Sequence, residues 1–168
     1  MFGNLFRERR RTLAIRQMTS PGPSVAPFLE RFVDTAAAAF VAPMAAASLI
    51  HAREQTVKAG HGLPTGCLPR DEGFCRFALD RPGVLECCDP QNDPRFAALP
   101  GVVGEPHIRY YIGAPLRLSN GIDVGALCVA DTVLRQPASH DQKAYLLGLA
   151  RQAAMALEHR LDLWGHAA

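Results

Sequence analysis

The sequence of 168 residues has no apolar run near the roughly 20 residues needed to cross a bilayer. Its longest apolar stretch, residues 35–43, is rich in alanine and ends at a proline. Residues 1–16 lack the apolar core of a secretion signal, which predicts a cytoplasmic protein. Charged residues make up only 20% of the chain and apolar residues 48%, a balance that excludes disorder. The length is too short for two ordinary domains, so one folded domain is expected.

Standard catalytic and cofactor-binding motifs are also missing. The sequence contains no GxGxxG or GxxxxGK[ST] loop for phosphate groups, no GxSxG nucleophile elbow and no HExxH zinc motif. Its five cysteines form no CxxC pair, and Cys87 and Cys88 are adjacent, which favours neither an ordinary disulfide nor a structural zinc site. We therefore expect reduced thiols and no metal, and no particular cofactor is predicted.

Positive charge is concentrated at the beginning of the chain. Residues 1–16 contain five arginines and one glutamate, a net charge of +4, whereas the remaining residues carry a net charge of −2. The rest of the chain has no bias toward nucleic acid, so no nucleic-acid partner is expected. We interpret residues 1–23 as a basic tail, with at most a short helix before Pro21-Gly22-Pro23. Such a tail could contact phosphate or anionic lipid.

Hydrophobic periodicity predicts an α+β fold. An amphipathic helix is expected over residues 25–41 after an N-cap at Ser24, and a longer one over residues 139–163 after a capping box. Strands are expected at residues 44–51, 55–59, 84–88, 108–118 and 124–130, short helices at 71–80 and 90–99, and loops at 60–70 and 100–106. Hairpins at both ends of this order imply a mostly antiparallel sheet with the long helices against one face.

A series of short motifs with a specific order and spacing runs through most of the chain. The motifs are Ser48-Leu49-Ile50, Gln55, Lys58-Ala59, Leu68-Pro69-Arg70, Phe74-Cys75, Asp89, Asp93-Pro94-Arg95-Phe96, residues 104–109, Tyr110-Tyr111-Ile112-Gly113-Ala114-Pro115-Leu116, Gly121 and residues 125–131. Over residues 25–163 this series resembles the GAF domain family, the small-molecule-sensing modules of signalling proteins. The likeness is to the bacterial branch that accompanies sensor kinases and cyclases.

The resemblance implies an antiparallel sheet of about six strands, with the N- and C-terminal helices on one face and a loop-covered pocket on the other. Periodicity finds only five strands, so the sixth is expected from a split of residues 108–118 or from the loop near residue 66. We expect one stand-alone GAF-like domain at residues 24–164, followed by a short C-terminal tail at 165–168.

The chain departs from the family pattern in several places. Thr56 stands where an aromatic residue is usual, Gly73 where a serine is usual and Cys88 where a proline is usual. The NKFDE signature of cyclic-nucleotide-binding GAF domains is missing, so the sequence does not favour a cyclic nucleotide. No cysteine is followed by histidine, so the sequence does not favour a covalently attached bilin either.

The resemblance and the strand pattern together give a set of candidate ligand-binding residues. His107, Arg109 and Tyr111 stand two residues apart, so they are expected to share one face of a strand. A histidine, an arginine and a tyrosine that converge on a pocket would suit an anionic or polar ligand. The alternative is that Arg109 pairs with Asp89 or Glu105 and fixes a loop. The full candidate set is Phe74, Cys75, Cys87, Asp89, Phe96, His107, Arg109, Tyr111 and Cys128.

The cysteines allow two interpretations. Buried Cys75, Cys87 and Cys128 would behave as small hydrophobic side chains. The alternative is a thiol sensor at Cys87 or Cys88, with Arg95 near enough to Cys88 to favour a thiolate. A small branch of the GAF family reduces free methionine sulfoxide with cysteines, and the cysteine pattern here does not match it.

Three functions stay open at this stage. The favoured one is a non-enzymatic sensory domain that binds a small molecule or a partner protein in signal transduction. It would form a homodimer through its terminal helices. The helix expected at residues 139–163 is longer than a small sheet is wide, so its apolar stripe near Leu161–Trp164 would extend beyond the sheet and could pair with a second copy. The alternatives are a cysteine-based redox sensor or free methionine sulfoxide reductase-like enzyme, and a ligand-free dimerisation scaffold whose pocket is filled by Phe74, Phe77 and Phe96.

Overall fold

The computed structural model describes the backbone of residues 2–19 and 24–165. Within these residues the helices are α1 (Phe2–Thr19), α2 (Ala26–Phe40), α3 (Pro100–Val103) and α4 (His140–Gly165). The strands are β1 (Met44–His51), β2 (Glu54–His61), β3 (Gly66–Pro69), β4 (Leu85–Cys87), β5 (Tyr110–Arg117) and β6 (Asp123–Asp131). Three single turns of 3₁₀-helix complete the order: η1 (Arg70–Glu72), η2 (Cys75–Ala78) and η3 (Pro90–Asn92). No helix within the described residues is long and apolar enough to span a bilayer.

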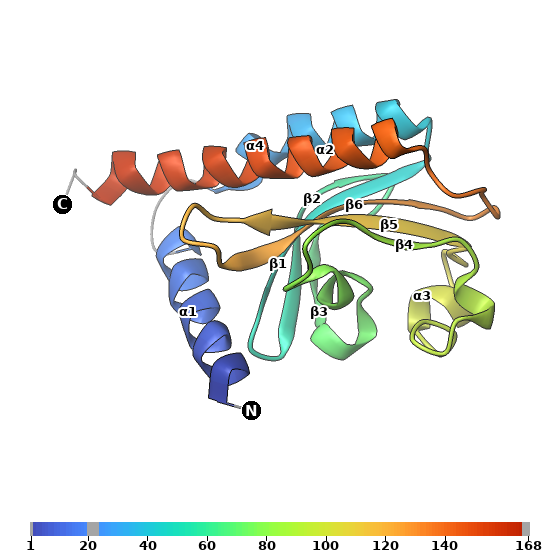
Figure 1. Ribbon diagram of the computed structural model, residues 1–168, viewed down its shortest axis with the longest axis horizontal. Helices are drawn as coiled ribbons and strands as arrows, with labels where there is room; N and C mark the ends of the chain where they lie inside the picture. Colours follow the sequence, from blue (N-terminus) through green and yellow to red (C-terminus); the bar gives the residue numbers. More distant parts are fainter. Residues whose placement is uncertain (1, 20–23, 166–168) are drawn as a thin grey trace.

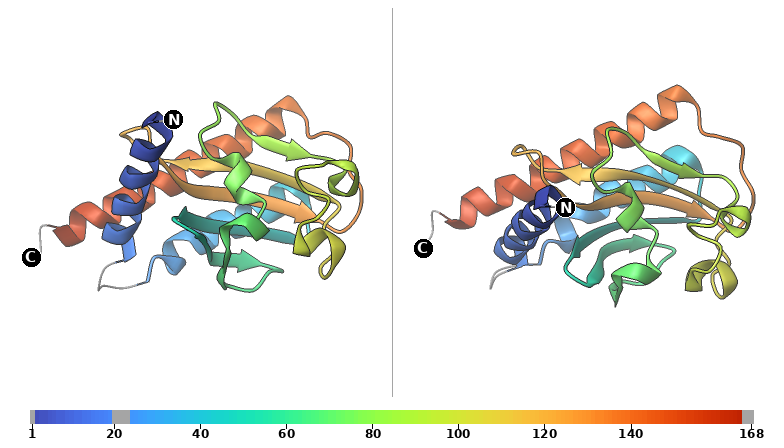
Figure 2. Two further views of the ribbon diagram at one scale, coloured as in Figure 1. Left: turned by 90° about the horizontal axis from the view of Figure 1, so that it is seen from below. Right: turned by 60° about the horizontal axis from the view of Figure 1, so that its bottom comes forward.

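The strands form one sheet with the order β3-β2-β1-β6-β5-β4, and every neighbouring pair is antiparallel. Helices α2 and α4 lie side by side over one face of this sheet (Figure 1). The loops that carry η1, η2, η3 and α3 cover the other face, and α1 lies at the opposite end of the sheet from α3 (Figures 1 and 2). The predicted α+β fold with helices on one face and loops on the other is therefore confirmed.

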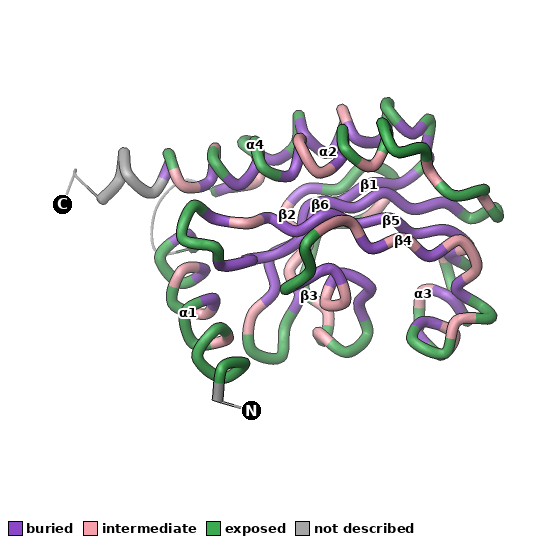
Figure 3. The backbone as a smooth tube through the Cα atoms, in the orientation of Figure 1, coloured by how far each residue is buried: buried purple, intermediate pink, exposed green. Residues whose placement is uncertain are grey.

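Side chains from the sheet form two cores, because successive strand residues point to opposite faces. Ala45, Leu49 and Leu127 pack against α2 and α4, whereas Ala46 and Cys128 pack beneath the loops. Strands β1, β5 and β6 are therefore buried along nearly their whole length (Figure 3). A sheet covered on both faces explains why these strands are almost continuously apolar in the sequence.

The two long helices begin near their predicted residues. At the start of α4, the predicted capping box forms: the Gln142 N–H donates to Ser139 Oγ over 3.1 Å, and the Ser139 N–H donates to Gln142 Oε1 over 3.0 Å. Ser24 Oγ accepts a hydrogen bond from the N–H of Ala26 at the start of α2. Three alanines of α4, at 150, 153 and 154, are fully buried within the chain. The small residues of the apolar stripe of α4 therefore pack in the core of the same chain. The side chains at 161–164, on which the predicted dimer contact depends, lie outside the described residues.

The sixth strand comes from the segment near residue 66. Strand β3 pairs Gly66–Pro69 with residues 54–57 of β2, inside the stretch predicted as a loop. Strand β5 is not split, because Pro115 stays in register opposite Ala126. The four residues of β3 are too few to show a period against neighbouring glycines and prolines, so the pattern predicted a loop there.

The N-terminal segment differs from the predicted tail, since α1 is an 18-residue helix packed against β1 and β6. Its inner face contains Ile15, Met18 and Arg11, and Arg11 is only 1% exposed. The Arg11 guanidinium donates to the carboxylates of Glu8 and Asp80 and to the backbone oxygen of Asp123. Because these partners satisfy a buried charge, a helix that looks polar in sequence can pack against the sheet.

Candidate functional site

A cavity of about 270 Å³ lies between the loop-covered face of the sheet and the segments above it. Its floor comes from alternate residues of β1, β2, β5 and β6, and its walls come from the segments around residues 63–75 and 100–108. The lining residues are Ala46, Ser48, Gln55, Val57, Leu63, Pro64, Leu68, Glu72, Gly73, Phe74, Cys75, Pro100, Gly101, Pro106, Ile108, Tyr111, Cys128 and Ala130. The lining is mostly apolar with a few polar groups, as is usual for small-molecule sites.

The polar groups of the lining are gathered on one side of the cavity. The Gln55 amide Nε2 donates to Ser48 Oγ over 3.3 Å, and the Tyr111 hydroxyl donates to Cys75 Sγ over 3.3 Å. Gln55 is only 5% exposed, yet its carbonyl oxygen Oε1 has no hydrogen-bond partner among the described residues. A buried acceptor without a donor costs free energy, so this oxygen is the feature of the cavity that most needs a partner.

Gly73 makes room for this oxygen. A Cβ atom added at Gly73 would clash with Gln55 Oε1. The glycine that departs from the usual serine of the family pattern therefore leaves space for the Gln55 side chain in its observed position.

A stack of aromatic rings closes one wall of the cavity. Phe74 stacks on Tyr111 with ring centroids 4.9 Å apart, and on its other side it stacks on Phe96 at 5.1 Å. Phe77 meets the edge of Phe96 at 5.0 Å. The phenylalanines pack against one another, and the cavity remains beside them.

The structure brings together some of the predicted site residues and separates others. Phe74, Cys75, Tyr111 and Cys128 line the cavity. The remaining candidates, which are not among the lining residues, are Cys87, Asp89, Phe96, His107 and Arg109. Phe96 is fully buried behind Phe74, and the Asp89 carboxylate accepts a hydrogen bond from Asn92.

His107 and Arg109 do not share a strand face with Tyr111, because β5 begins only at Tyr110. His107 has a left-handed φ of 60°, which turns the chain before the strand starts. Its half-exposed imidazole lies 3.6 Å from Glu105. The Arg109 guanidinium donates to the backbone oxygens of Val102 and Ile108, so it fixes the loop through carbonyl groups.

Ser48, Gln55 and Gly73 belong to the site but are not among the sequence-predicted candidates. Ser48 and Gln55 are part of the motifs that carry the family resemblance, and Gly73 was noted as a departure from it. The signal that could have found Ser48 is its alternation with Ala46 and Ile50 on the face of β1 that lies under the loops. A polar residue at such a position in an otherwise apolar strand needs a partner.

The adjacent cysteines lie on opposite faces of the sheet, Cys87 under the loops and Cys88 against the helix-side core. Burial raises the pKa of the Cys87 thiol to about 11, with a further contribution from the nearby Asp93 carboxylate. Burial and the Glu86 carboxylate raise the pKa of Cys88. The side chain of Arg95 pairs with Asp93, so the expected activation of Cys88 by Arg95 is wrong.

Cys75 and Cys128 lie close together in the cavity wall. The neighbouring Cys128 thiol lowers the pKa of Cys75 against the effect of burial, and the same neighbour contact raises the pKa of Cys128. Both thiols are buried. Within the described part of the chain, no three histidine, cysteine, aspartate or glutamate side chains lie close enough to hold a metal ion.

These environments predict the order in which the thiols react. With a colorimetric disulfide reagent at neutral pH, exposed Cys67 is expected to react first and the four other thiols at least about tenfold more slowly. Raising the pH toward 9 should speed the reaction of Cys88, because a raised pKa leaves little thiolate at pH 7. The Cys67→Ser variant should lose the fast phase alone. A fast phase that persists in that variant and disappears on substitution of Cys88 would contradict this order.

Comparison with known proteins gives the same family over most of the chain. The family described as GAF domain matches residues 24–157. A cyclic di-GMP phosphodiesterase of Pseudomonas aeruginosa is 39% identical over 132 residues, which are 79% of this chain and 22% of that protein. The chain therefore spans about a fifth of the length of this curated relative.

Solved structures share the fold at low sequence identity. The GAF domain of an Acinetobacter phosphoenolpyruvate-protein phosphotransferase aligns with a TM-score of 0.67 at 18% identity, covering 96% of each chain. A type II free methionine-R-sulfoxide reductase from Thermoplasma acidophilum aligns with a TM-score of 0.60 at 16% identity, covering 81% of this chain and 96% of that one. Because the family match covers most of the sequence and the sheet, helices and covered cavity agree with it, the chain belongs to the GAF domain family.

Proposed function

We propose that this chain is a regulatory domain that binds a small molecule in the cavity over β1, β5 and β6 without catalysing its conversion. The observation that carries the proposal is the buried Gln55 carbonyl oxygen, which lies beside Gly73 in the wall of a mostly apolar cavity and lacks a donor among the described residues. A ligand with an N–H or O–H group would supply the missing hydrogen bond. Membership of a family of signalling modules supports a regulatory role.

The size of the cavity limits the ligand. The cavity volume is about 270 Å³. It lies at the lower end of ordinary small-molecule pockets, which run from roughly 300 Å³ upward. The proposed ligand is therefore a small, largely apolar compound, with one donor group for Gln55 and a face that lies against Phe74 and Tyr111.

The sheet offers a route from the ligand to the rest of the molecule. Strands β1, β5 and β6 form the cavity floor on one face and carry α2 and α4 on the other. A ligand that binds two arrangements of the loops with different affinity would shift the packing of these helices. Two further predictions remain: a homodimer formed through the terminal helices, and a signalling partner protein. Light scattering of the full chain tests the homodimer.

A thiol-based enzyme is the second candidate function, because one structural neighbour is named a reductase. Its predicted nucleophiles, Cys87 and Cys88, both have raised pKa values, which disfavours a thiolate at neutral pH. The scaffold alternative is disfavoured by the cavity that remains beside the phenylalanine stack.

All five cysteines are free thiols, which fits the proposed location in the reducing cytoplasm.

The test replaces Gln55 with methionine, which has a similar shape but no carbonyl oxygen. Chain purified from its own host is denatured, and the released small molecules are measured by mass spectrometry. We expect the Gln55→Met variant to retain at most about a tenth of the compound that the wild-type chain binds. The reason is that the donor group of the ligand would be left unpaired in a mostly apolar site. Its free energy of unfolding should fall by only about 1 to 2 kcal/mol, because the substitution deletes the hydrogen bond from Nε2 to Ser48 Oγ together with the unpaired oxygen.

Gln152→Met on the exposed side of α4 provides the matched control and should retain the compound. A variant at Gln55 that binds as much compound as wild type would contradict the assigned role of this side chain. Loss of the compound together with loss of the fold, seen by circular dichroism, would point to a structural role for Gln55.

A further inference from the structure

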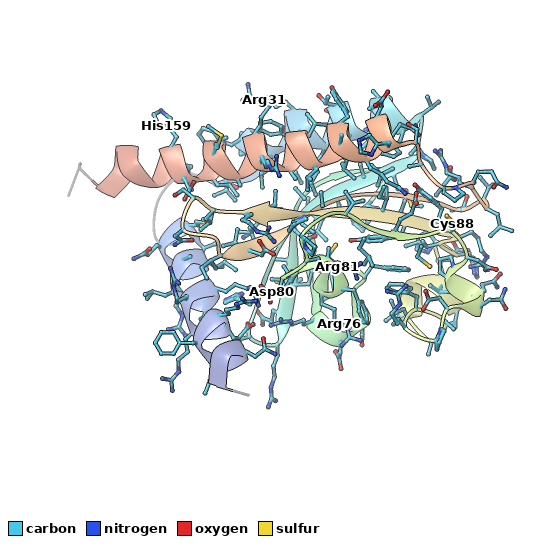
Figure 4. All side chains as sticks on the ribbon, in the orientation of Figure 1. Arg31, Arg76, Asp80, Arg81, Cys88 and His159 are labelled. Atoms are coloured by element: carbon cyan, nitrogen blue, oxygen red, sulfur yellow. The ribbon has the colours of Figure 1, made fainter. Side chains whose placement is uncertain are left out.

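Helix α1 is held against the domain by one face only. Arg11, Ile15 and Met18 form that face, and the Arg11 guanidinium reaches Asp80, which lies beside α1 (Figure 4). Glu8 adds a second attachment, because its carboxylate accepts hydrogen bonds from the N–H of Ala52 and from the Arg70 guanidinium. The helix is therefore fixed in orientation, and its outer face is presented to solvent in a defined direction.

The outer face of α1 combines exposed apolar side chains with arginines. Leu5, Phe6 and Leu13 are 56%, 71% and 61% exposed, so three large apolar side chains of one helix are presented to solvent. Phe6 and Leu13 stand seven residues apart, so they share one stripe of the helix, and Leu5 lies beside it. The flanking residues are Arg9, Arg10 and Arg16, all exposed, and Arg7 is exposed at the edge of the inner face.

These arginines have no acidic partner within the described residues. The one acidic residue of the helix, Glu8, already pairs with Arg11 and Arg70. The outer face therefore carries three positive charges, from Arg9, Arg10 and Arg16, that nothing in the described structure neutralises.

The basic surface continues beyond the helix. Ala52, at the turn between β1 and β2, lines a groove with Leu5, Arg9 and Leu13 of α1, and it also lines the adjoining groove. That second groove contains Arg53, Arg70 and Arg76 together with one acidic residue, Asp71, and Arg70 is paired with Glu8. Positive charge is thus spread over a broad area around α1, on the side of the molecule away from α2 and α4.

We propose that the outer face of α1 docks on the surface of an anionic phospholipid bilayer. Phe6 and Leu13 would enter the boundary between headgroups and acyl chains, while the arginines on either side contact lipid phosphates. An apolar stripe flanked by basic residues is the pattern of helices that lie in the plane of a membrane surface. Each basic residue near such a surface adds to the attraction, which salt screens.

Other occupants of this face fit less well. Pairing with a second copy would set the arginines of both helices against one another, with no free carboxylate on α1 to separate them. A nucleic acid would engage the arginines but would leave the exposed phenylalanine and leucine side chains without a role. An anionic membrane uses both features of the surface at once.

The test is co-sedimentation of the whole chain with vesicles. Wild-type protein is expected to bind vesicles of equal parts phosphatidylglycerol and phosphatidylcholine, and to bind pure phosphatidylcholine at least about tenfold more weakly. The Arg9→Gln/Arg10→Gln variant removes charge, and Phe6→Ser/Leu13→Ser removes the apolar stripe. Each variant should bind the anionic vesicles at least about tenfold more weakly, and raised salt should weaken wild type.

Matched controls lie on the far, helical side of the molecule. Arg31→Gln/Arg151→Gln removes two exposed arginines from α2 and α4, and Met155→Ser removes an exposed apolar side chain from α4 (Figure 4 shows Arg31 on that side). Both control variants should bind as wild type does. Because every substituted side chain is exposed, circular dichroism should show the fold unchanged in each variant.

Several results would overturn the proposal. One is no binding of wild type to anionic vesicles at low salt, and another is equal loss of binding in the α2 and α4 controls. A third result has two parts: soluble polyglutamate displaces the wild-type chain fully from anionic vesicles, and the Phe6→Ser/Leu13→Ser variant binds those vesicles as wild type does. That result would assign the outer face of α1 to an acidic protein. A fourth is a dimer in light scattering that dissociates in the Phe6→Ser/Leu13→Ser variant.

Discussion

Replacing Phe96 with alanine is expected to lower the free energy of unfolding by about 3 to 5 kcal/mol, the usual cost of deleting a fully buried phenylalanine. Phe96 is 0% exposed, and its ring contacts Phe74 on one side and the edge of Phe77 on another. The stack that closes the cavity wall depends on it, although Phe96 does not line the cavity. Urea unfolding followed by circular dichroism measures the change.

Phe28→Ala provides the control, because this phenylalanine on α2 is 42% exposed. It should cost no more than about 1 kcal/mol, since half-exposed side chains lose less contact on truncation. Equal destabilisation by the two substitutions would contradict the view that the aromatic stack is a main element of the loop-side core.

Replacing Arg11 with alanine is expected to cost about 2 to 4 kcal/mol, somewhat less than the loss of a wholly buried ion pair. Arg11 is buried, whereas the carboxylates of Glu8 and Asp80 keep partial contact with water. The substitution removes the Arg11 donor from the Asp80 carboxylate and from the backbone oxygen of Asp123, whereas Glu8 keeps its hydrogen bonds from Arg70 and Ala52. It also removes the side-chain packing that α1 makes with the end of the sheet.

The effect should be concentrated in α1, which hydrogen exchange can resolve. Amides of α1 are expected to lose protection while those of β1 and β6 keep it, because the sheet core does not depend on Arg11. The exposed neighbour Arg10→Ala should change stability by less than about 0.5 kcal/mol. Uniform loss of protection across the domain would show that α1 is an integral part of the core.

The two long helices and most of the sheet could be predicted because their burial patterns are local. The stripe of α2 and the continuous apolar runs of β1 and β6 are visible in windows of ten or so residues. Helix α1 could not be recognised in this way, because Arg11 is buried only through partners at Asp80 and Asp123, far along the chain. Strand β3 could not either, since its four residues are held by pairing with β2.

The candidate site was predictable in part for the same reason. Cys75, Tyr111 and Cys128 lie in segments whose positions follow from the family pattern, and all of them line the cavity. His107 and Arg109 do not, because a single left-handed residue ends the alternation on which their placement relied. Gln55 becomes notable only when the structure shows that its carbonyl oxygen lacks a donor.

The most direct test of the proposed sensory role is a comparison of the native and denatured masses of the chain purified from its own host. The native mass is expected to exceed the denatured mass by that of one small compound per chain. This excess should be missing in the Gln55→Met variant. A native mass equal to that of the polypeptide alone, for wild-type protein that is folded by circular dichroism, would contradict the assignment of the cavity as a ligand site.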